Sequence, residues 1–323
     1  MRLLYNALII GAGNIGAFFD TPDSENILTH AHAYWKHKGF NLLGFVDIDQ
    51  TKSRKAASIW GGNGYSSIED AFKLEMIDVV SVAVPDEYHF EVLKKLSRFP
   101  VKLVFTEKPL ARTLNEAREI FDLYSGKNIP VAVNYSRRFV PEIQKIKNNI
   151  EKGQYGPYMA GTGYYGKGLV HNGSHLIDLL RFFKREATGS VPISSIVDFY
   201  PDDKSISAVL SFKDKTHFTL LNADCRSYTL FEIDLLFEKG RIRILDSGFR
   251  IEEYKIRQNT LFKGYRNLFK TKETDTSLGN SVYFAIDNIH NHLTKGAHLA
   301  CSLEDGYKTL KTCLKIKNQS DGQ

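Results

Sequence analysis

The feature that most constrains this chain is a glycine triplet directly after a short apolar run. Residues 7–10 are apolar, and Gly11, Gly13 and Gly16 follow in the spacing G-x-G-x-x-G. This spacing predicts a buried strand that turns sharply into a helix, whose first amides favour a phosphate. Gly11 makes the turn, Gly13 lets a pyrophosphate approach the backbone, and Gly16 lets the helix pack closely on its strand. The same triplet also occurs in plain turns, so the rest of the chain must decide between the two.

The next segment departs from the usual strand–helix–strand unit. The cluster Thr21-Pro22-Asp23-Ser24 breaks a helix, and a helical pattern resumes at Thr29, which suits an N-cap. We therefore expect an inserted loop at about residues 20–28.

An acidic residue ends the second predicted strand. The apolar segment 42–46 is followed by Asp47, in the position where a carboxylate accepts hydrogen bonds from ribose hydroxyls. Its charge would repel a 2′-phosphate and no Lys or Arg directly follows, which favours NAD over NADP. The alternative is that Asp47 only ends the strand or caps the next helix.

Strands and helices continue to alternate through the first half. Apolar segments at 79–84, 102–105 and 131–133 predict strands, separated by amphipathic helices near 90–98 and 114–124. This alternation predicts a doubly wound, mostly parallel sheet, whose carboxyl edge is the usual ligand site.

The second half has a different pattern. Helices are expected at 140–152 and from Asn172 onward, then strands at 206–212, 217–223, 231–237, 241–245 and 249–256. These hairpin-linked strands predict an α+β domain with a large, mainly antiparallel open sheet. Helices at 281–293 and 302–315 close the chain, Ser302 and Asp305 form a capping pair, and 318–323 is a disordered tail. The predicted domains are residues 1–135 and 136–323.

One basic segment leaves two interpretations open. Residues 257–280 hold five Lys or Arg side chains with three aromatic residues between them. They form either a solvated, mobile loop or a lid over an anionic substrate.

Composition excludes several protein classes. The net charge of +6 is modest for 323 residues, and no basic stripe indicates nucleic acid. No apolar run approaches the roughly 18 residues of a membrane span. Three scattered cysteines argue against a disulfide framework or zinc finger and fit a reducing cytoplasm.

Four motifs in order carry a family resemblance: G-A-G-N-I-G, V-A-V-P-D-E-Y-H, T-E-K-P-L-A and N-Y-S-R-R-F-V-P. The chain resembles the Gfo/Idh/MocA oxidoreductases, the relatives of glucose–fructose oxidoreductase and inositol dehydrogenase. The resemblance implies that Lys108 of E-K-P is catalytic, beside nicotinamide and substrate. It also implies a set of cofactor contacts: Gly11, Gly13, Asn14, Ile15, Gly16, Asp47, Pro85, His89, Glu107 and Lys108.

The role of Lys108 has a chemical basis and a plain alternative. A lysine at a desolvated strand end can lower the pKa of a sugar hydroxyl or relay its proton. The alternative is a surface pair with Glu107. A cis bond before Pro109 is compatible with the sequence.

Two histidines four residues apart form the second catalytic candidate. The family shows Asp-x-Gly-x-His here, so His175 falls on its histidine and would be the general base. His171 stands in place of the aspartate, which leaves its role in the dyad open. Zinc bound by His171, His175 and Asp178, or plain cap and core roles, are the alternatives. Tyr164 and Tyr165 are alternative proton donors.

Together these features predict an NAD-dependent oxidoreductase that moves a hydride between nicotinamide and a sugar-like hydroxyl or ketone. Alternatives are an NAD-retaining glycosidase or eliminase without net redox change, and a non-catalytic dinucleotide-binding regulator. The expected protein is cytoplasmic, without resident metal, and a homodimer or homotetramer through the second-domain sheet. The expected substrate contacts are Lys108, Tyr135, Arg138, Tyr165, Asn172 and His175.

Overall fold

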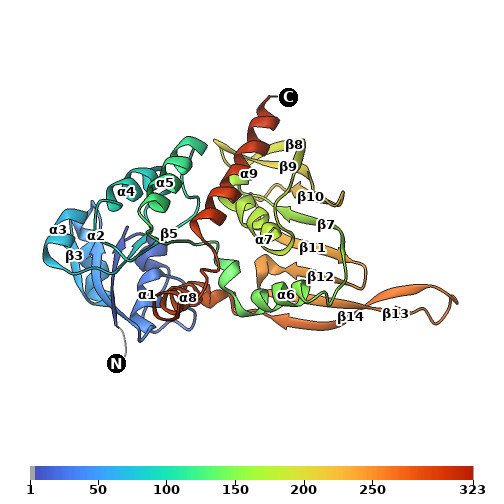
Figure 1. Cartoon of the computed structure of the whole chain (residues 1–323), viewed down its shortest axis with the longest axis horizontal. Coiled ribbons are helices and arrows are strands. Elements are labelled where there is room, and N and C mark those ends of the chain that lie inside the picture. Colours follow the sequence, from blue (N-terminus) through green and yellow to red (C-terminus); the bar gives the residue numbers. More distant parts are fainter. Residues whose placement is uncertain (1–3, 323) are drawn as a thin grey trace. The chain divides into compact units, whose positions relative to one another are not determined.

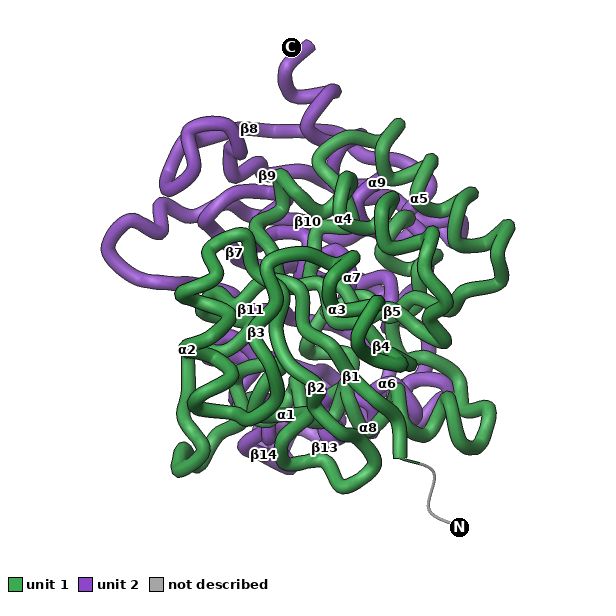
Figure 2. Tube along the Cα trace, turned by 90° about the vertical axis from the view of Figure 1, so that its left-hand side faces the viewer, with its two compact units in different colours: residues 1–139, 279–308 green, residues 140–278, 309–323 purple. Residues whose placement is uncertain are grey.

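The computed structural model describes residues 4–322 and divides into two compact units (Figure 2). Unit 1 comprises residues 1–139 and 279–308, and unit 2 comprises residues 140–278 and 309–323. The predicted division at 135/136 is therefore wrong for residues 279–308, which return to the first unit.

Unit 1 is built on a parallel sheet in the order β3-β2-β1-β4-β5-β6. Buried aliphatic side chains fill its central strands, because both faces of such a sheet are covered by helices. The strands are β1 (Tyr5–Ile10), β2 (Phe40–Val46), β3 (Asn63–Tyr65), β4 (Val79–Val82), β5 (Leu103–Thr106) and β6 (Val131–Val133).

The helices of unit 1 follow the predicted alternation with short additions. Thr29 caps α1 by accepting from the amide of His32, as expected. The helices are α1 (His30–Lys36), α2 (Gln50–Trp60), α3 (Ile68–Leu74), α4 (His89–Leu96), α5 (Leu114–Gly126) and α8 (Ser281–Lys295), with the short turns η1 (Asn14–Phe18), η2 (Asp86–Tyr88) and η3 (Ser136–Phe139).

Helix α8 explains the corrected boundary. The Tyr5 hydroxyl donates to the carbonyl of Leu293, and the amide of Ile27 donates to the side chain of Asn280. These partners are more than 250 positions apart in the chain. Contacts at such separation leave no local signal in the sequence.

Unit 2 carries an eight-stranded sheet in the order β14-β13-β12-β11-β7-β10-β9-β8. All neighbours are antiparallel except β7 and β10, which confirms the predicted fold class. The strands are β7 (Tyr158–Tyr165), β8 (Gly189–Tyr200), β9 (Asp203–Ser211), β10 (His217–Asn222), β11 (Phe231–Phe237), β12 (Gly240–Leu245), β13 (Arg250–Gln258) and β14 (Arg266–Asp275).

The helices of unit 2 gather beside one face of its sheet. The side chain of Leu176 on α7 lies against Gly163 of β7, where a Cβ would come within 2.6 Å of it. The helices are α6 (Pro141–Glu151), α7 (Ser174–Lys184) and α9 (Leu303–Asp321), with the turns η4 (Leu169–Gly173), η5 (Asp246–Gly248) and η6 (Leu278–Asn280). Residues 303–308 of α9 and residues 279–280 of η6 belong to unit 1.

The structure tests three local predictions for the second half of the chain: the loop at 257–280, the tail at 318–323 and the cap formed by Ser302 and Asp305. Residues 266–275 form strand β14, paired with β13 along its length, so the interpretation as a loop is wrong for these residues, whereas residues 259–265 do form the loop of the hairpin. The hairpin extends beyond the other strands of the sheet (Figure 1). Helix α9 runs to Asp321, so residues 318–321 are not a disordered tail. Ser302 and Asp305 do cap that helix reciprocally.

No helix among residues 4–322 is both long and apolar enough to cross a membrane.

Candidate functional site

The glycine loop of unit 1 has the geometry that its spacing predicts. Gly11 adopts φ of +101°, and a Cβ there would lie 2.6 Å from the backbone of Ala83. A Cβ on Gly16 would lie 2.1 Å from the carbonyl oxygen of Gly11. At Gly13, by contrast, a Cβ would meet nothing within 4 Å. Gly11 and Gly16 are therefore required by the fold itself, whereas Gly13 leaves space open on the backbone.

The helix after the glycine loop is shorter than a dinucleotide fold usually provides. It is a single π-helical turn, Asn14–Phe18, after which the chain leaves for the expected insertion. Asp20 holds that insertion, because its buried carboxylate accepts from the amides of Leu28 and Thr29 and bonds the ring of His32 at 2.9 Å. Hydrogen bonds to this one buried carboxylate therefore hold the two ends of the inserted loop together.

A cavity of about 1010 Å³ opens beside the glycine loop. The ends of β1, β2 and β4 line it, through residues that include Gly11, Gly13, Asp47, Ala83 and Pro85. These are carboxyl ends of parallel strands, where open α/β sheets bind ligands. The volume matches the upper range of small-molecule and cofactor sites, about 300–1,000 Å³.

Asp47 stands at the junction of the glycine loop and the cavity. One carboxylate oxygen accepts from the amide of Ala12 at 2.8 Å, and the other accepts from the amide of Asp49 at 2.9 Å. The side chain therefore fixes the loop and also lines the cavity. Lys94 and Lys95, further along the same wall, form ion pairs with Glu119 and Glu69.

His89 does not lie in this cavity. It is 1% exposed, with Nδ1 2.6 Å from the carbonyl oxygen of Pro109 and Nε2 2.9 Å from that of Val84. The expected direct cofactor contact of His89 is therefore wrong for this structure, because the ring is used to tie α4 to the E-K-P turn.

The E-K-P turn follows β5 and contains a cis Lys108–Pro109 bond. Glu107 is mostly buried there, and its Oε1 accepts from Nδ2 of Asn134 at 2.6 Å and bonds Nε2 of His30 at 3.0 Å. The other His30 nitrogen meets Oγ of Ser81, which also bonds the hydroxyl of Tyr34. A buried polar chain thus runs from α1 through β4 to the residue before Lys108.

Two opposing effects act on the Glu107 carboxyl. Burial raises its pKa, while the hydrogen bond and charge of His30, the bond from Asn134 and the charge of Lys108 lower it. The lowering effects prevail, and the pKa lies below its ordinary value. Glu107 is therefore an ionised group engaged with His30 and Asn134, and its expected cofactor contact stays a prediction.

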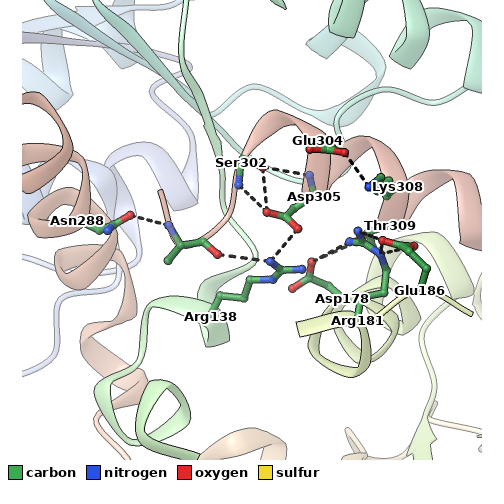
Figure 3. A network of polar contacts seen from close by, with 11 residues as sticks. Arg138, Asp178, Arg181, Glu186, Asn288, Ser302, Glu304, Asp305, Lys308 and Thr309 are labelled. Atoms are coloured by element: carbon green, nitrogen blue, oxygen red, sulfur yellow. Dashed lines mark hydrogen bonds and ion pairs between the residues drawn. The ribbon is translucent and has the colours of Figure 1, made fainter. Parts of the chain in front are cut away.

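Tyr135 and Arg138 lie just after β6 and are both buried. Arg138 forms an ion pair with Asp305 at 3.0 Å, and Asp305 in turn caps α9 through Ser302 (Figure 3). The expectation that Arg138 contacts substrate is corrected by this pairing, because a buried guanidinium removed from its carboxylate would leave an uncompensated charge. Tyr135 is 1% exposed.

In unit 2, the two predicted histidines lie on successive turns at the start of α7. His171 belongs to the π-helical turn Leu169–Gly173, and His175 to the first turn of α7; both are half-buried. Asn172 lies between them and donates from Nδ2 to the carbonyl of Gly166 at 2.8 Å.

The Asp178 carboxylate bonds a residue of α9. Its Oδ1 accepts from the hydroxyl of Thr309, which also accepts from Arg181 (Figure 3). Among residues 4–322, no group of three or more His, Cys, Asp or Glu side chains is arranged to hold a metal ion.

The sequence did not identify Asp203, which lies beside His171. Its Oδ2 is 2.8 Å from Nδ1 of His171 and also accepts from the His171 amide. The signal was absent because Asp203 starts a strand 32 positions further along the chain. His30 was missed for a similar reason: nothing near it in the sequence marks its contact with Glu107.

The two tyrosines of β7 point to opposite sides of the sheet. Tyr165 is fully buried, and its hydroxyl donates to the carbonyl of Ile206 and accepts from the same residue's amide. Tyr165 is therefore a core residue and not the expected substrate contact or proton donor. Tyr164 is 42% exposed.

Comparison with known proteins places residues 5–135 in one family. They match the model described as "Oxidoreductase family, NAD-binding Rossmann fold", the Gfo/Idh/MocA family. An uncharacterised oxidoreductase of Schizosaccharomyces pombe is 26% identical over 190 residues, which cover 53% of this chain but only 49% of that protein. Inositol 2-dehydrogenase of Corynebacterium glutamicum is 24% identical over 336 residues, covering 94% of this chain and 93% of that enzyme.

Solved structures share the whole fold at low identity. The WlbA dehydrogenase of Bordetella pertussis, in complex with NADH and UDP-GlcNAcA, superposes with a TM-score of 0.77 at 16% identity, covering 98% of this chain and 96% of that one. An oxidoreductase of Agrobacterium radiobacter in complex with NAD+, L-tartaric acid and magnesium gives 0.78 at 17% identity, covering 99% and 97%. At these identities the likeness establishes the fold alone.

Proposed function

We propose that this chain, whose residues 5–135 match the Gfo/Idh/MocA family of NAD-binding oxidoreductases, transfers a hydride between NAD and a hydroxyl or ketone of a sugar-like substrate. The observation that carries the proposal is the cavity in which the glycine loop meets Asp47. Relatives named as dehydrogenases of inositol and levoglucosan support the substrate class.

The residues around the cavity fit a dinucleotide. The open backbone at Gly13 provides the close approach that a pyrophosphate needs. Asp47 offers carboxylate oxygens for ribose hydroxyls and negative charge against a 2′-phosphate, which favours NAD over NADP. Oδ1 of Asn134 is buried without a hydrogen-bond partner within the described chain, so one acceptor beside Glu107 remains for a bound group.

In the proposed reaction, bound NAD supplies the acceptor for the hydride that leaves the carbinol carbon. The hydroxyl proton of the same carbon passes to a base as the carbonyl forms, so one hydride and one proton leave the alcohol. We assign the proton to His175 and a supporting role to Lys108, whose positive charge favours the alkoxide-like transition state. Asn172 is the remaining candidate from unit 2 for substrate contact.

The lysine role is tested by replacing Lys108 with Met. We expect NADH binding to be retained and kcat to fall by about 10²–10⁴-fold, the usual contribution of a positioned acid or base. Lys102→Met is the matched control, because this lysine precedes the same strand and pairs with Asp78 on the surface. NADH absorbance with sugars, inositols and nucleotide sugars measures the rate. Full turnover in Lys108→Met with normal NADH binding would refute the mechanism.

We also propose a cytoplasmic homodimer or homotetramer. None of the three cysteines forms a disulfide in the structure, which suits a reducing compartment. The strand β8 at the edge of the unit 2 sheet exposes alternate apolar side chains, Val191, Ile193, Val197 and Phe199. A second copy of this chain is the proposed cover for that face.

A further inference from the structure

The ring of His171 is held on two sides. Its Nδ1 lies 2.8 Å from Oδ2 of Asp203, and its plane stacks on Tyr200 with 3.9 Å between ring centroids and 14° between planes. About 25% of the side chain is exposed. A half-buried imidazole with a fixed plane and a carboxylate on one nitrogen is pre-arranged for proton exchange.

Asp203 is itself fixed. Its side chain is about 4% exposed, and its oxygens also accept from the amides of Val170 and His171. Gly168 passes so close that a Cβ there would lie 2.2 Å from Oδ2, and the residue adopts φ of +82°. The turn that carries His171 is therefore wrapped around this carboxylate.

The charge of Asp203 is directed to the imidazole. Burial raises the pKa of Asp203. The hydrogen bonds from the His171 ring and from the two amides, together with the charge of His171, lower this pKa by more than burial raises it, so it lies below its ordinary value. Tyr165 and Cys313 also lie within its field, and burial raises the pKa of both. Both are therefore neutral near pH 7. Because an ionised carboxylate only accepts, Nδ1 of His171 donates to it.

We propose that Asp203 is a positioning residue that makes His171 an acid–base group of the proton-transfer step. With Nδ1 carrying the proton toward Asp203, the lone pair of the neutral ring lies on Nε2. Asp203 thereby supplies, from another strand, the carboxylate that the sequence lacks at position 171. The inference rests on the proposed function and extends it: the hydroxyl proton that leaves with hydride transfer is shared between His171 and His175.

The test uses Asp203→Asn with Asp198→Asn as its control. Asp198 is a comparably buried carboxylate on the neighbouring strand, and it accepts from the amides of Lys167 and Cys225 and from Ser205 but bonds no histidine. Ring ¹⁵N spectra at alkaline pH, assigned with His171→Gln, report which nitrogen carries the proton. We expect Nδ1–H in the wild type and in Asp198→Asn, and a shift toward Nε2–H in Asp203→Asn.

Kinetics provide the second measurement. Asp203→Asn should lower kcat by about 100-fold and displace the acidic limb of its pH profile, while Asp198→Asn leaves that limb in place. In a His171→Gln background, Asp203→Asn should change kcat by no more than about twofold, since its effect passes through His171.

Two results would overturn the inference, and a third concerns only the proposed function. An unchanged His171 tautomer in Asp203→Asn, or an equal loss of kcat with and without His171, would mean that Asp203 only holds the turn. A wild type that binds NADH but turns over no sugar-like substrate would refute the proposed function. The tautomer measurement does not depend on turnover, so the two failures remain distinguishable.

Discussion

Replacing Gly13 with Ala separates the ligand-binding role of the glycine loop from its folding role. A Cβ at Gly13 meets no protein atom within 4 Å, and its φ of −90° is accessible to any residue. Alanine also loses less backbone entropy on folding, by about 0.4–1 kcal/mol, which offsets its poorer fit at a helix start. The unliganded variant should therefore melt within about a degree or two of the wild type. This difference corresponds to a change of about 0.5 kcal/mol in the free energy of unfolding.

Binding should respond quite differently. If the pyrophosphate lies against the Gly13 backbone, the added methyl group occupies its place, and such overpacking costs about 1–3 kcal/mol. That range corresponds to a rise of about 5–150-fold in the Kd for NADH. Calorimetric titration measures the Kd, and thermal melting without ligand measures the fold.

Gly16→Ala is the matched variant. Its Cβ would lie 2.1 Å from the carbonyl oxygen of Gly11, a backbone atom that cannot move aside cheaply. We expect a loss of about 1–3 kcal/mol of stability even without ligand. Wild-type NADH affinity in Gly13→Ala would refute the placement of the pyrophosphate, and wild-type melting of Gly16→Ala would refute the packing argument.

Two further predictions concern pH and assembly. The pKa of Glu107 is lower in the folded chain than its ordinary value of 4.5, so its contribution to stability is complete above about pH 4.5 and is lost as pH falls through the folded pKa. His30→Ala removes the main lowering partner and should move the midpoint of acid unfolding to higher pH, as followed by circular dichroism; an unchanged midpoint would contradict the assigned pairing. Ile193→Lys on the exposed face of β8 should dissociate the proposed homo-oligomer without lowering the melting temperature of the separated chain, since the side chain is 59% exposed. Light scattering measures the mass, and a monomeric wild type would exclude this interface.

Local chemistry in the sequence was sufficient for much of unit 1. The glycine spacing, the acid after β2 and the caps at Thr29 and Ser302 each depend on residues within a few positions, so the backbone geometry follows from them. The family motifs, read in order, also identified the cofactor class.

Tertiary structure alone decided how distant segments meet. The return of α8 to the first unit, the pairing of β14 with β13, and the contacts of His30 with Glu107 and of Asp203 with His171 all join residues far apart in the chain. The tertiary structure also decided the partners of His89, Arg138 and Tyr165. The polar atoms of these three side chains bond other groups of the protein, which the sequence did not predict. A residue type states which bonds a side chain can form, but burial and neighbours determine which of them it forms.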